Sequence, residues 1–202
     1  MQLSYASSDR ELWARDASIG RIVSVNGSKA VVLLDSAPNG AQRRPEHRPE
    51  MGTLLVVEQA NTSVLAIVSA LCVPVPAQRE GDNELWIAEL GLVGELWKDA
   101  SGNPISFNRG VTIYPALGDR VRVASRAELE MAFCGNPATS VRVGSLRQDP
   151  NIAAMVKVDD LLGKHFAILG TTGTGKSCTT ALILRAILEK NPAAHIVLLD
   201  AH

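Results

Sequence analysis

The sequence predicts a mixed fold, in which an N-terminal antiparallel β-barrel is followed by the start of an α/β domain with a parallel sheet. From residue 20 to about residue 125, short β-rich runs alternate with turn clusters, a rhythm typical of small barrels and sandwiches. Residues 165–200 read instead as strand, glycine-rich loop, helix and strand, which is the order of a right-handed βαβ unit. The expected boundaries are a barrel at 1–135, a connector at 136–160 and the start of the α/β domain at 161–202.

The barrel half begins with a hairpin signal. Residues 21–25 and 30–34 are short runs rich in strand-forming residues, and they flank Asn26 and Gly27, a dipeptide that favours a tight turn between antiparallel strands. Four further runs have the composition of strands, and they lie at 53–58, 64–73, 84–94 and 120–124.

The segments around the last strands are expected to be turns and a short helix. Residues 104–110 and 114–118 contain proline and glycine, so they are predicted to connect strands. Residues 125–134 are rich in good helix formers, and a short helix is expected to close the barrel there. Within the connector, residues 154–158 are a candidate strand.

Length and composition are those of a globular protein with room for one domain and part of another. The chain has 202 residues, is 46% hydrophobic and carries a net charge of −1. Its apolar runs are far shorter than the ~20 residues of a membrane span, and residues 1–5 lack the pattern of a secretory signal. Three widely spaced cysteines do not suggest a disulfide framework. We therefore expect a cytoplasmic protein that makes no use of a membrane.

The near-neutral charge removes the simplest argument for nucleic-acid binding, which is a strongly basic domain. The best local basic patch is Arg43, Arg44 and Arg48, but glutamates in the same window offset two of these charges and its prolines favour a loop between strands. An acidic stretch lies further along the barrel and comprises Glu80, Asp82, Glu84, Glu89, Glu95 and Asp99. Such a stretch is usually a solvated face, and a partner-docking surface is the alternative.

A glycine-rich loop at residues 170–177 matches the pattern G-x-x-x-x-G-K-[ST] at every fixed position. It lies between an apolar run at 165–169, expected to be a buried strand, and a segment at 177–190, expected to be a helix. This context is that of a phosphate-binding loop, so the α/β domain is predicted to be of the P-loop type. The residues expected to bind a nucleotide are Gly170, Thr171, Thr172, Gly173, Thr174, Gly175, Lys176, Ser177 and Cys178.

Each residue type in this loop suits phosphate chemistry. Gly170, Gly173 and Gly175 lack a Cβ, so the backbone can take positive φ angles and turn its N–H groups toward an anion. The helix that follows adds free N–H donors and the positive end of its dipole. Lys176 is expected to reach the β- and γ-phosphates, and the Ser177 hydroxyl is expected to ligate Mg²⁺.

The order of these features resembles the HerA family, which comprises bacterial and archaeal ATPases related to the FtsK translocases. The resemblance rests on His-Phe-Ala-Ile-Leu-Gly-Thr-Thr-Gly-Thr-Gly-Lys-Ser at 165–177 and His-Ile-Val-Leu-Leu-Asp-Ala-His at 195–202, preceded by a barrel. The N-terminal half is similar to the family's barrel, which rotary ATP synthases share, and the similarity to the end of that barrel lies at 107–111, 114–115 and 118–121. The resemblance covers the whole chain.

The resemblance implies a hexameric ring that couples ATP hydrolysis, with Mg²⁺, to movement along duplex DNA. It further implies a partner nuclease or other effector docked on the barrel, in DNA-end processing or anti-phage defence. Lys176 and Asp200 would be the catalytic residues, since Asp200 matches the acidic residue that ends the family's second strand. Asp200 would order Mg²⁺-bound water, or it would simply cap that strand.

Several parts of the family's catalytic machinery would lie beyond residue 202: an acidic metal-coordinating strand, a catalytic glutamate, an arginine finger and the pore loops. The chain alone is therefore expected to bind nucleotide without hydrolysing it. A nucleotide-regulated assembly module, whose barrel forms the ring and recruits an effector, is the alternative function. The same loop also serves small-molecule kinases and GTPases. The barrel argues against a kinase. No guanine-reading Asn-Lys-x-Asp occurs in residues 1–202, but such a motif would be expected beyond them, so the GTPase alternative stays open.

Overall fold

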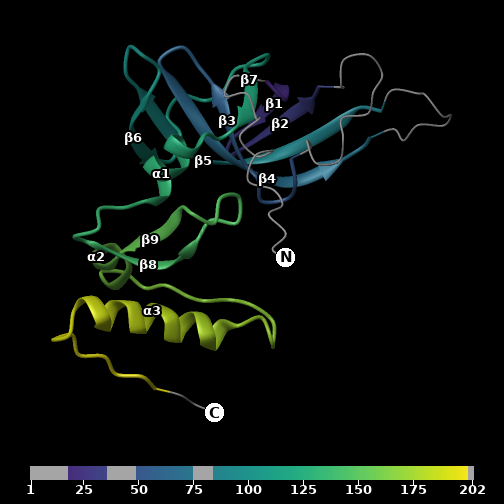
Figure 1. The fold of residues 1–202 in the computed structure, drawn as a ribbon. Helices are drawn as coiled ribbons and strands as arrows, with labels where there is room; N and C mark the ends of the chain where they lie inside the picture. The colour runs from purple at the N-terminus through teal and green to yellow at the C-terminus, as the bar shows by residue number, and fades with distance from the viewer. Residues whose placement is uncertain (1–17, 36–48, 75–83, 200–202) are drawn as a thin grey trace, which may run out of the picture. The chain divides into compact units, whose positions relative to one another are not determined.

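The computed structural model describes residues 18–35, 49–74 and 84–199 (Figure 1). The chain forms two compact units, which divide between Glu128 and Leu129. Within the described ranges, no helix has the length and apolar character needed to cross a membrane. Six residues singled out in the sequence lie outside the described residues: Arg43, Arg44, Arg48, Glu80, Asp82 and Asp200.

The first unit contains a closed antiparallel barrel of six strands, which confirms the predicted barrel. Its strands are β1 (Gly20–Asn26), β2 (Lys29–Leu34), β3 (Leu54–Glu58), β4 (Thr62–Cys72), β5 (Trp86–Lys98) and β7 (Arg120–Val123). They follow one another around the barrel in the order β2, β1, β7, β3, β4 and β5. Residues 86–91 of β5 then pair with residues 29–34 of β2, and this pairing closes the ring.

Aliphatic side chains fill the barrel core. In β2, the alternate residues Ala30, Val32 and Leu34 are buried, as expected when every second side chain of a strand faces the same side of the sheet. The β1–β2 hairpin turns at Gly27, whose φ of 54° would strain any residue with a Cβ. Each fully buried valine or leucine side chain contributes roughly 1.5–3 kcal/mol by leaving water, so this core is the main source of the barrel's stability.

Residues 104–110 are mainly a strand, so their prediction as a turn is wrong. β6 (Pro104–Arg109) pairs antiparallel with residues 94–98 of β5. β5 is 13 residues long and extends past β2, so its last part offers an edge to β6 (Figure 1). Pro104 is the first residue of β6, a position where a missing N–H costs little. The turn lies before it, where the Asp99 carboxylate accepts hydrogen bonds from the N–H groups of Ser101 (2.9 Å) and Asn103 (2.8 Å).

The acidic stretch does not form a single solvated face. Glu95 is only 2% exposed, and its carboxylate accepts hydrogen bonds from the N–H groups of Thr112 and Ile113, the latter at 2.6 Å. Burial would raise the pKa of Glu95, but these hydrogen bonds and one from the Thr112 hydroxyl outweigh it and hold that pKa below its usual value. Glu95 is therefore an internal anchor of the segment after β6, because backbone donors replace its water.

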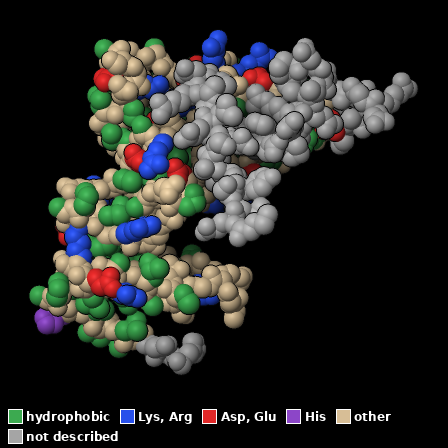
Figure 2. Space-filling model, viewed as in Figure 1, with side chains coloured by type: hydrophobic (Ala, Val, Ile, Leu, Met, Phe, Trp, Pro, Cys, Tyr) green, Lys and Arg blue, Asp and Glu red, His purple; other side chains and the backbone are tan. Residues whose placement is uncertain are grey.

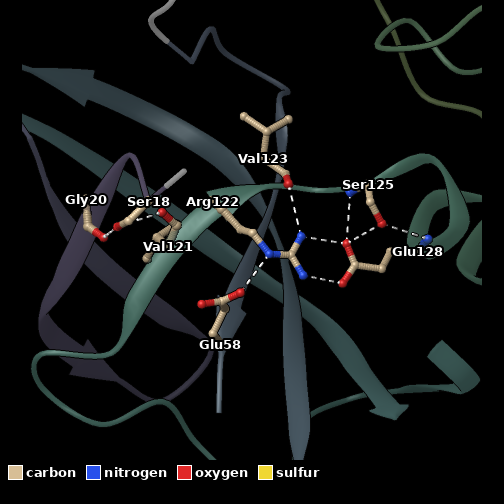
Figure 3. Close-up of polar contacts among 8 residues, drawn as sticks. All are labelled: Ser18, Gly20, Glu58, Val121, Arg122, Val123, Ser125 and Glu128. Atoms are coloured by element: carbon tan, nitrogen blue, oxygen red, sulfur yellow. Dashed lines mark hydrogen bonds and ion pairs between the residues drawn. The ribbon is translucent and has the colours of Figure 1, made fainter. Parts of the chain in front are cut away.

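An ion-pair network, buried at Arg122 and Glu128, joins β7, β3 and α1 (Arg126–Phe133), the helix predicted at 125–134 (Figure 3). Arg122 of β7 donates hydrogen bonds to both oxygens of the Glu128 carboxylate, at 2.8 Å and 2.7 Å, and its Nε donates to Glu58 of β3 at 2.8 Å. The N–H and Oγ–H of Ser125 donate to Glu128 Oε2, both at 2.8 Å, and the Glu128 N–H donates back to Ser125 Oγ at 3.4 Å. This reciprocal capping sets the start of α1.

After α1, which spans the boundary between the units, the described part of the second unit contains a hairpin and two helices. The hairpin is formed by β8 (Ser140–Ser145) and β9 (Ala153–Lys157), and the helices are α2 (Val158–Leu162) and α3 (Lys176–Lys190). α3 matches the helix predicted at 177–190. A small apolar core joins α3 to β8 and α2, and it comprises Val141, Val143, Val158, Leu161, Ile183, Ala186 and Ile187. Ile187 is the one fully buried residue of α3, so a narrow strip of the helix makes this contact.

The parallel sheet predicted around the glycine-rich loop is not formed by the described residues. Neither residues 165–169 nor residues 195–199 are paired as strands, and Leu169, Val197 and Leu199 are 88%, 85% and 91% exposed. Figure 2 shows hydrophobic side chains on the surface of the unit that carries α3. A strand needs neighbours for its N–H and C=O groups, and the hairpin of this unit pairs with neither segment. Apolar composition alone is therefore not sufficient for strand formation here.

Candidate functional site

The glycine-rich loop leads directly into α3. Gly175 is the N-cap residue of this helix, with φ 85° and ψ 19°, and α3 begins at Lys176. Gly173 has the same φ of 85°. Both angles lie in the left-handed region, where a Cβ would be strained, so glycine suits both positions just before the helix.

Gly170 serves a different purpose from the one predicted. Its φ is not positive, so its assignment as a left-handed position is wrong. A Cβ at Gly170 would lie 2.5 Å from Thr174 Oγ1, which is far inside the contact distance of real Cβ atoms. The side chain of Thr174 folds back against the start of the loop, so a Cβ at residue 170 would force this side chain to move.

The Thr171 carbonyl is the centre around which the loop closes. It accepts hydrogen bonds from the Thr174 hydroxyl at 2.7 Å, from the Thr174 N–H at 3.3 Å and from Lys176 Nζ at 2.7 Å. The loop is therefore organised by its own side chains. The Lys176 ammonium thus contacts the backbone of the loop itself.

The first turn of α3 presents a group of backbone donors. Its first intrahelical hydrogen bond runs from the Thr179 N–H to the Gly175 carbonyl, at 2.9 Å. The N–H groups of Lys176, Ser177 and Cys178 thus have no partner within the helix. This first turn contains no acidic side chain, so nothing there offsets the positive end of the helix dipole.

These donors fit the phosphates of a nucleotide. The site offers backbone N–H groups at a helix start and one ammonium, which is the kind of donor set that surrounds a phosphate. The two left-handed glycines shape the backbone around these donors. The exposed hydroxyl of Ser177 is an oxygen ligand of the type that Mg²⁺ prefers. Among the described residues, no cluster of acidic, histidine or cysteine side chains forms a metal site of its own. A metal bound here would therefore take phosphate oxygens as some of its ligands.

The structure brings most of the predicted site residues together, since residues 170–178 form one continuous loop and first turn. Asp200 lies outside the described residues, so its position relative to the loop stays a prediction. Sequence reasoning named Thr174 as a nucleotide-binding residue but missed its role as the side chain that closes the loop. It also missed Lys190, which anchors the far end of α3. The signal for Lys190 was available, because a lysine in the last turn of a helix commonly binds free carbonyl groups.

Comparison with known proteins gives consistent matches. The family model of the HerA helicase central domain matches residues 141–202. The DNA double-strand break repair helicase HerA of Pyrococcus furiosus is 31% identical over 157 residues, which cover 75% of this chain and 26% of that protein. A probable DNA double-strand break repair helicase HerA of Methanocaldococcus jannaschii is 29% identical over 121 residues, which cover 60% of this chain and 22% of that protein. The chain thus spans about a quarter of the length of these relatives.

Proposed function

Because the chain belongs to the HerA family, we propose that residues 170–178 bind ATP with Mg²⁺, within a subunit of an ATP-dependent DNA translocase or helicase. One observation carries the nucleotide part of this proposal. The loop presents an ammonium and three backbone N–H groups without helical partners, at a helix start that contains no acidic side chain. Such an arrangement favours a multiply charged anion over any neutral ligand.

Individual residues receive distinct roles in this proposal. The ammonium of Lys176 leaves the Thr171 carbonyl and binds the β- and γ-phosphates, and the N–H groups of Ser177 and Cys178 hold phosphate oxygens. Ser177 supplies a hydroxyl ligand to Mg²⁺, and Asp200 orders the surroundings of the metal. When bound, Mg²⁺ neutralises phosphate charge. Gly173 and Gly175 keep the backbone close enough for these contacts.

The wider proposal concerns the assembly. We place a barrel domain at 1–135, a connector at 136–160 and the start of a P-loop α/β domain at 161–202, in a subunit of a hexameric ring that acts on duplex DNA. A nuclease or another effector docks on the barrel, in DNA-end processing or anti-phage defence. The names of the relatives, which refer to a helicase and to double-strand break repair, support the DNA part. The proposed location is the cytoplasm.

Titration with nucleotide tests the site. The 202-residue chain should bind a fluorescent ATP analogue in the presence of Mg²⁺, and Lys176→Ala should weaken binding at least tenfold while the melting temperature stays unchanged. Equal affinity of the two proteins would refute the site. For the assembly, ATP hydrolysis by the whole protein should increase with duplex DNA and disappear with Lys176→Ala.

A nucleotide-regulated docking module is the second candidate, and one observation on the barrel favours it. The segment at residues 111–118 exposes Ile113, Tyr114 and Leu117, by 48%, 51% and 71%, although hydrogen bonds hold it in place. Gln59 Nε2 donates to the Tyr114 carbonyl at 3.0 Å, and the Gly118 N–H donates to the Ile22 carbonyl at 2.8 Å. A rigid segment that exposes apolar side chains suits partner binding. This candidate would be favoured if duplex DNA did not stimulate ATP hydrolysis by the whole protein and the barrel bound an effector.

A further inference from the structure

An ammonium group links the far end of α3 to the β8–β9 hairpin. Lys190 is the last residue of the helix, and its Nζ donates hydrogen bonds to the carbonyl oxygens of Pro137 and of Ser140, the latter at 2.8 Å. Both acceptors belong to the turn and first residue that begin β8. One side chain therefore ties the carboxyl end of α3 to the β8–β9 hairpin.

The other attachments of α3 are few. Ile187 is the one fully buried residue of the helix, and Ile183 and Ala186 complete a narrow apolar strip against β8 and α2. Ile183 is the middle residue of α3, and Ala186 and Ile187 lie in its second half. The first half, which carries the loop, includes Leu182 at 46% exposure, and its described residues make no comparable core. The direction in which α3 points is thus set from its carboxyl end.

We propose that Lys190 is a positioning residue for the phosphate loop, and this inference rests on the proposed nucleotide function of that loop. A rise of 1.5 Å per residue places Lys176 about 21 Å from Lys190 along the helix axis. Over that length, a swing of about 5° at the anchored end moves the loop by about 2 Å. Phosphate contacts are made at hydrogen-bond distance, so a displacement of this size removes several of them.

The chain offers a matched control on the same helix. Arg185 donates to Glu189 at 2.7 Å, but this pair is solvent-exposed and lies one turn apart on α3 alone. Arg185→Met removes a cation and a hydrogen bond without touching the hairpin. Lys190→Met removes a cation and two hydrogen bonds that cross to the hairpin, while keeping the apolar stem.

The experiment is a titration of the 202-residue chain with a fluorescent ATP analogue and Mg²⁺, at a temperature well below the melting transition of every variant. Lys190→Met should weaken binding about tenfold, Lys190→Arg should restore it to within about threefold of the parent, and Arg185→Met should leave it unchanged. If Lys190→Met does not fold, Lys190→Gln retains one N–H donor group and should show an intermediate loss of affinity.

The outcomes separate the two proposals. Folded Lys190→Met or Lys190→Gln with unchanged affinity overturns the positioning role and leaves Lys190 as a structural anchor only. An equal loss in Arg185→Met overturns it too, because the effect would then come from charge on the helix. Lys176→Ala, run alongside, tests the nucleotide site itself: if that variant binds as the parent does, the proposed function fails first.

Discussion

Arg122 and Glu128 face each other as a two-pronged ion pair, with 11% and 3% of their side-chain surfaces exposed. The two partners lie six residues apart, on β7 and on α1. Ser125 between them caps the helix, because its Oγ accepts the Glu128 N–H, and its own N–H donates to the same carboxylate. Burial of a charge is costly unless the charge is paired and hydrogen-bonded. Glu128 meets this condition, because Arg122 donates to both of its oxygens and the N–H and hydroxyl of Ser125 donate to Oε2.

Glu128→Gln should destabilise the barrel strongly. The substitution leaves the Arg122 charge buried with only Glu58 to balance it, so we expect a loss of about 3 kcal/mol in the free energy of unfolding. All three tryptophans of the chain belong to residues 1–128, so denaturant unfolding followed by tryptophan fluorescence reports on this unit. Glu89→Gln is the control, because the Lys29–Glu89 pair is exposed and 3.8 Å long and should matter little. Equal effects of the two substitutions would contradict the argument.

The same pair predicts how barrel stability depends on pH. Burial would raise the pKa of Glu128, but the hydrogen bonds from Arg122 and Ser125 outweigh it and hold that pKa below the usual value of 4.5. The unfolded state therefore takes up the proton first, and the stabilisation is present above about pH 4.5 and is lost as the pH falls toward the folded-state pKa. The stability difference between the parent and Glu128→Gln should shrink as the pH is lowered from 6 to 3. A difference that stays constant would refute the ionised pair.

Glu95 should control the order of the segment after β6. Its carboxylate accepts hydrogen bonds from two consecutive backbone N–H groups, those of Thr112 and Ile113. In Glu95→Gln, one carboxylate oxygen is replaced by an NH₂ group, which cannot accept a hydrogen bond from these N–H groups. We therefore expect a loss of about 1–3 kcal/mol in the free energy of unfolding. Hydrogen exchange of the Thr112 and Ile113 amides should become faster, while exchange in β1 and β2 stays unchanged. Unaltered exchange at Thr112 would show that other contacts hold the segment.

The barrel was largely predictable from the sequence because its signals are local. Alternating apolar residues and the Asn26–Gly27 turn specify β1 and β2, and Ser125 with Glu128 three residues later is a capping box that marks the start of α1. β6 was not predictable in this way. Its strand character comes from the free edge of an unusually long β5, and a proline and a glycine at its ends imitate a turn.

In the loop region, too, the features set by local sequence were predictable and those set by distant contacts were not. The helix α3 and the left-handed angles of Gly173 and Gly175 follow from residue type and spacing, so local reasoning found them. The role of Gly170 depends on where the side chain of Thr174 folds, which spacing does not reveal. The strands predicted on either side depend on hydrogen-bonding partners elsewhere in the fold, and apolar composition alone carries no information about those partners.

Gly175 and Gly170 are expected to resist substitution for different reasons, backbone strain and a steric clash, and a second substitution at Thr174 can distinguish the two. Gly175→Ala places a Cβ at a φ of 85°, and this strain of about 1–2 kcal/mol is intrinsic to the backbone. Gly170→Ala instead creates a clash, because its Cβ would lie 2.5 Å from Thr174 Oγ1, while the next nearest atoms, on Lys176 and Thr174, are 3.5 Å away. Both single variants should bind the fluorescent ATP analogue more weakly than the parent.

Thr174→Ala removes the clashing oxygen, so it should restore much of the affinity lost in Gly170→Ala and none of that lost in Gly175→Ala. The Thr174→Ala single variant is the reference for both doubles, since it also loses the 2.7 Å hydrogen bond to the Thr171 carbonyl. Measured as a double-mutant cycle, Gly170 and Thr174 should show a favourable coupling, whereas Gly175 and Thr174 should be nearly additive. Additive behaviour of Gly170 and Thr174 would mean that the loop relaxes around the added methyl group, and that Gly170 is not required by the position of the threonine side chain.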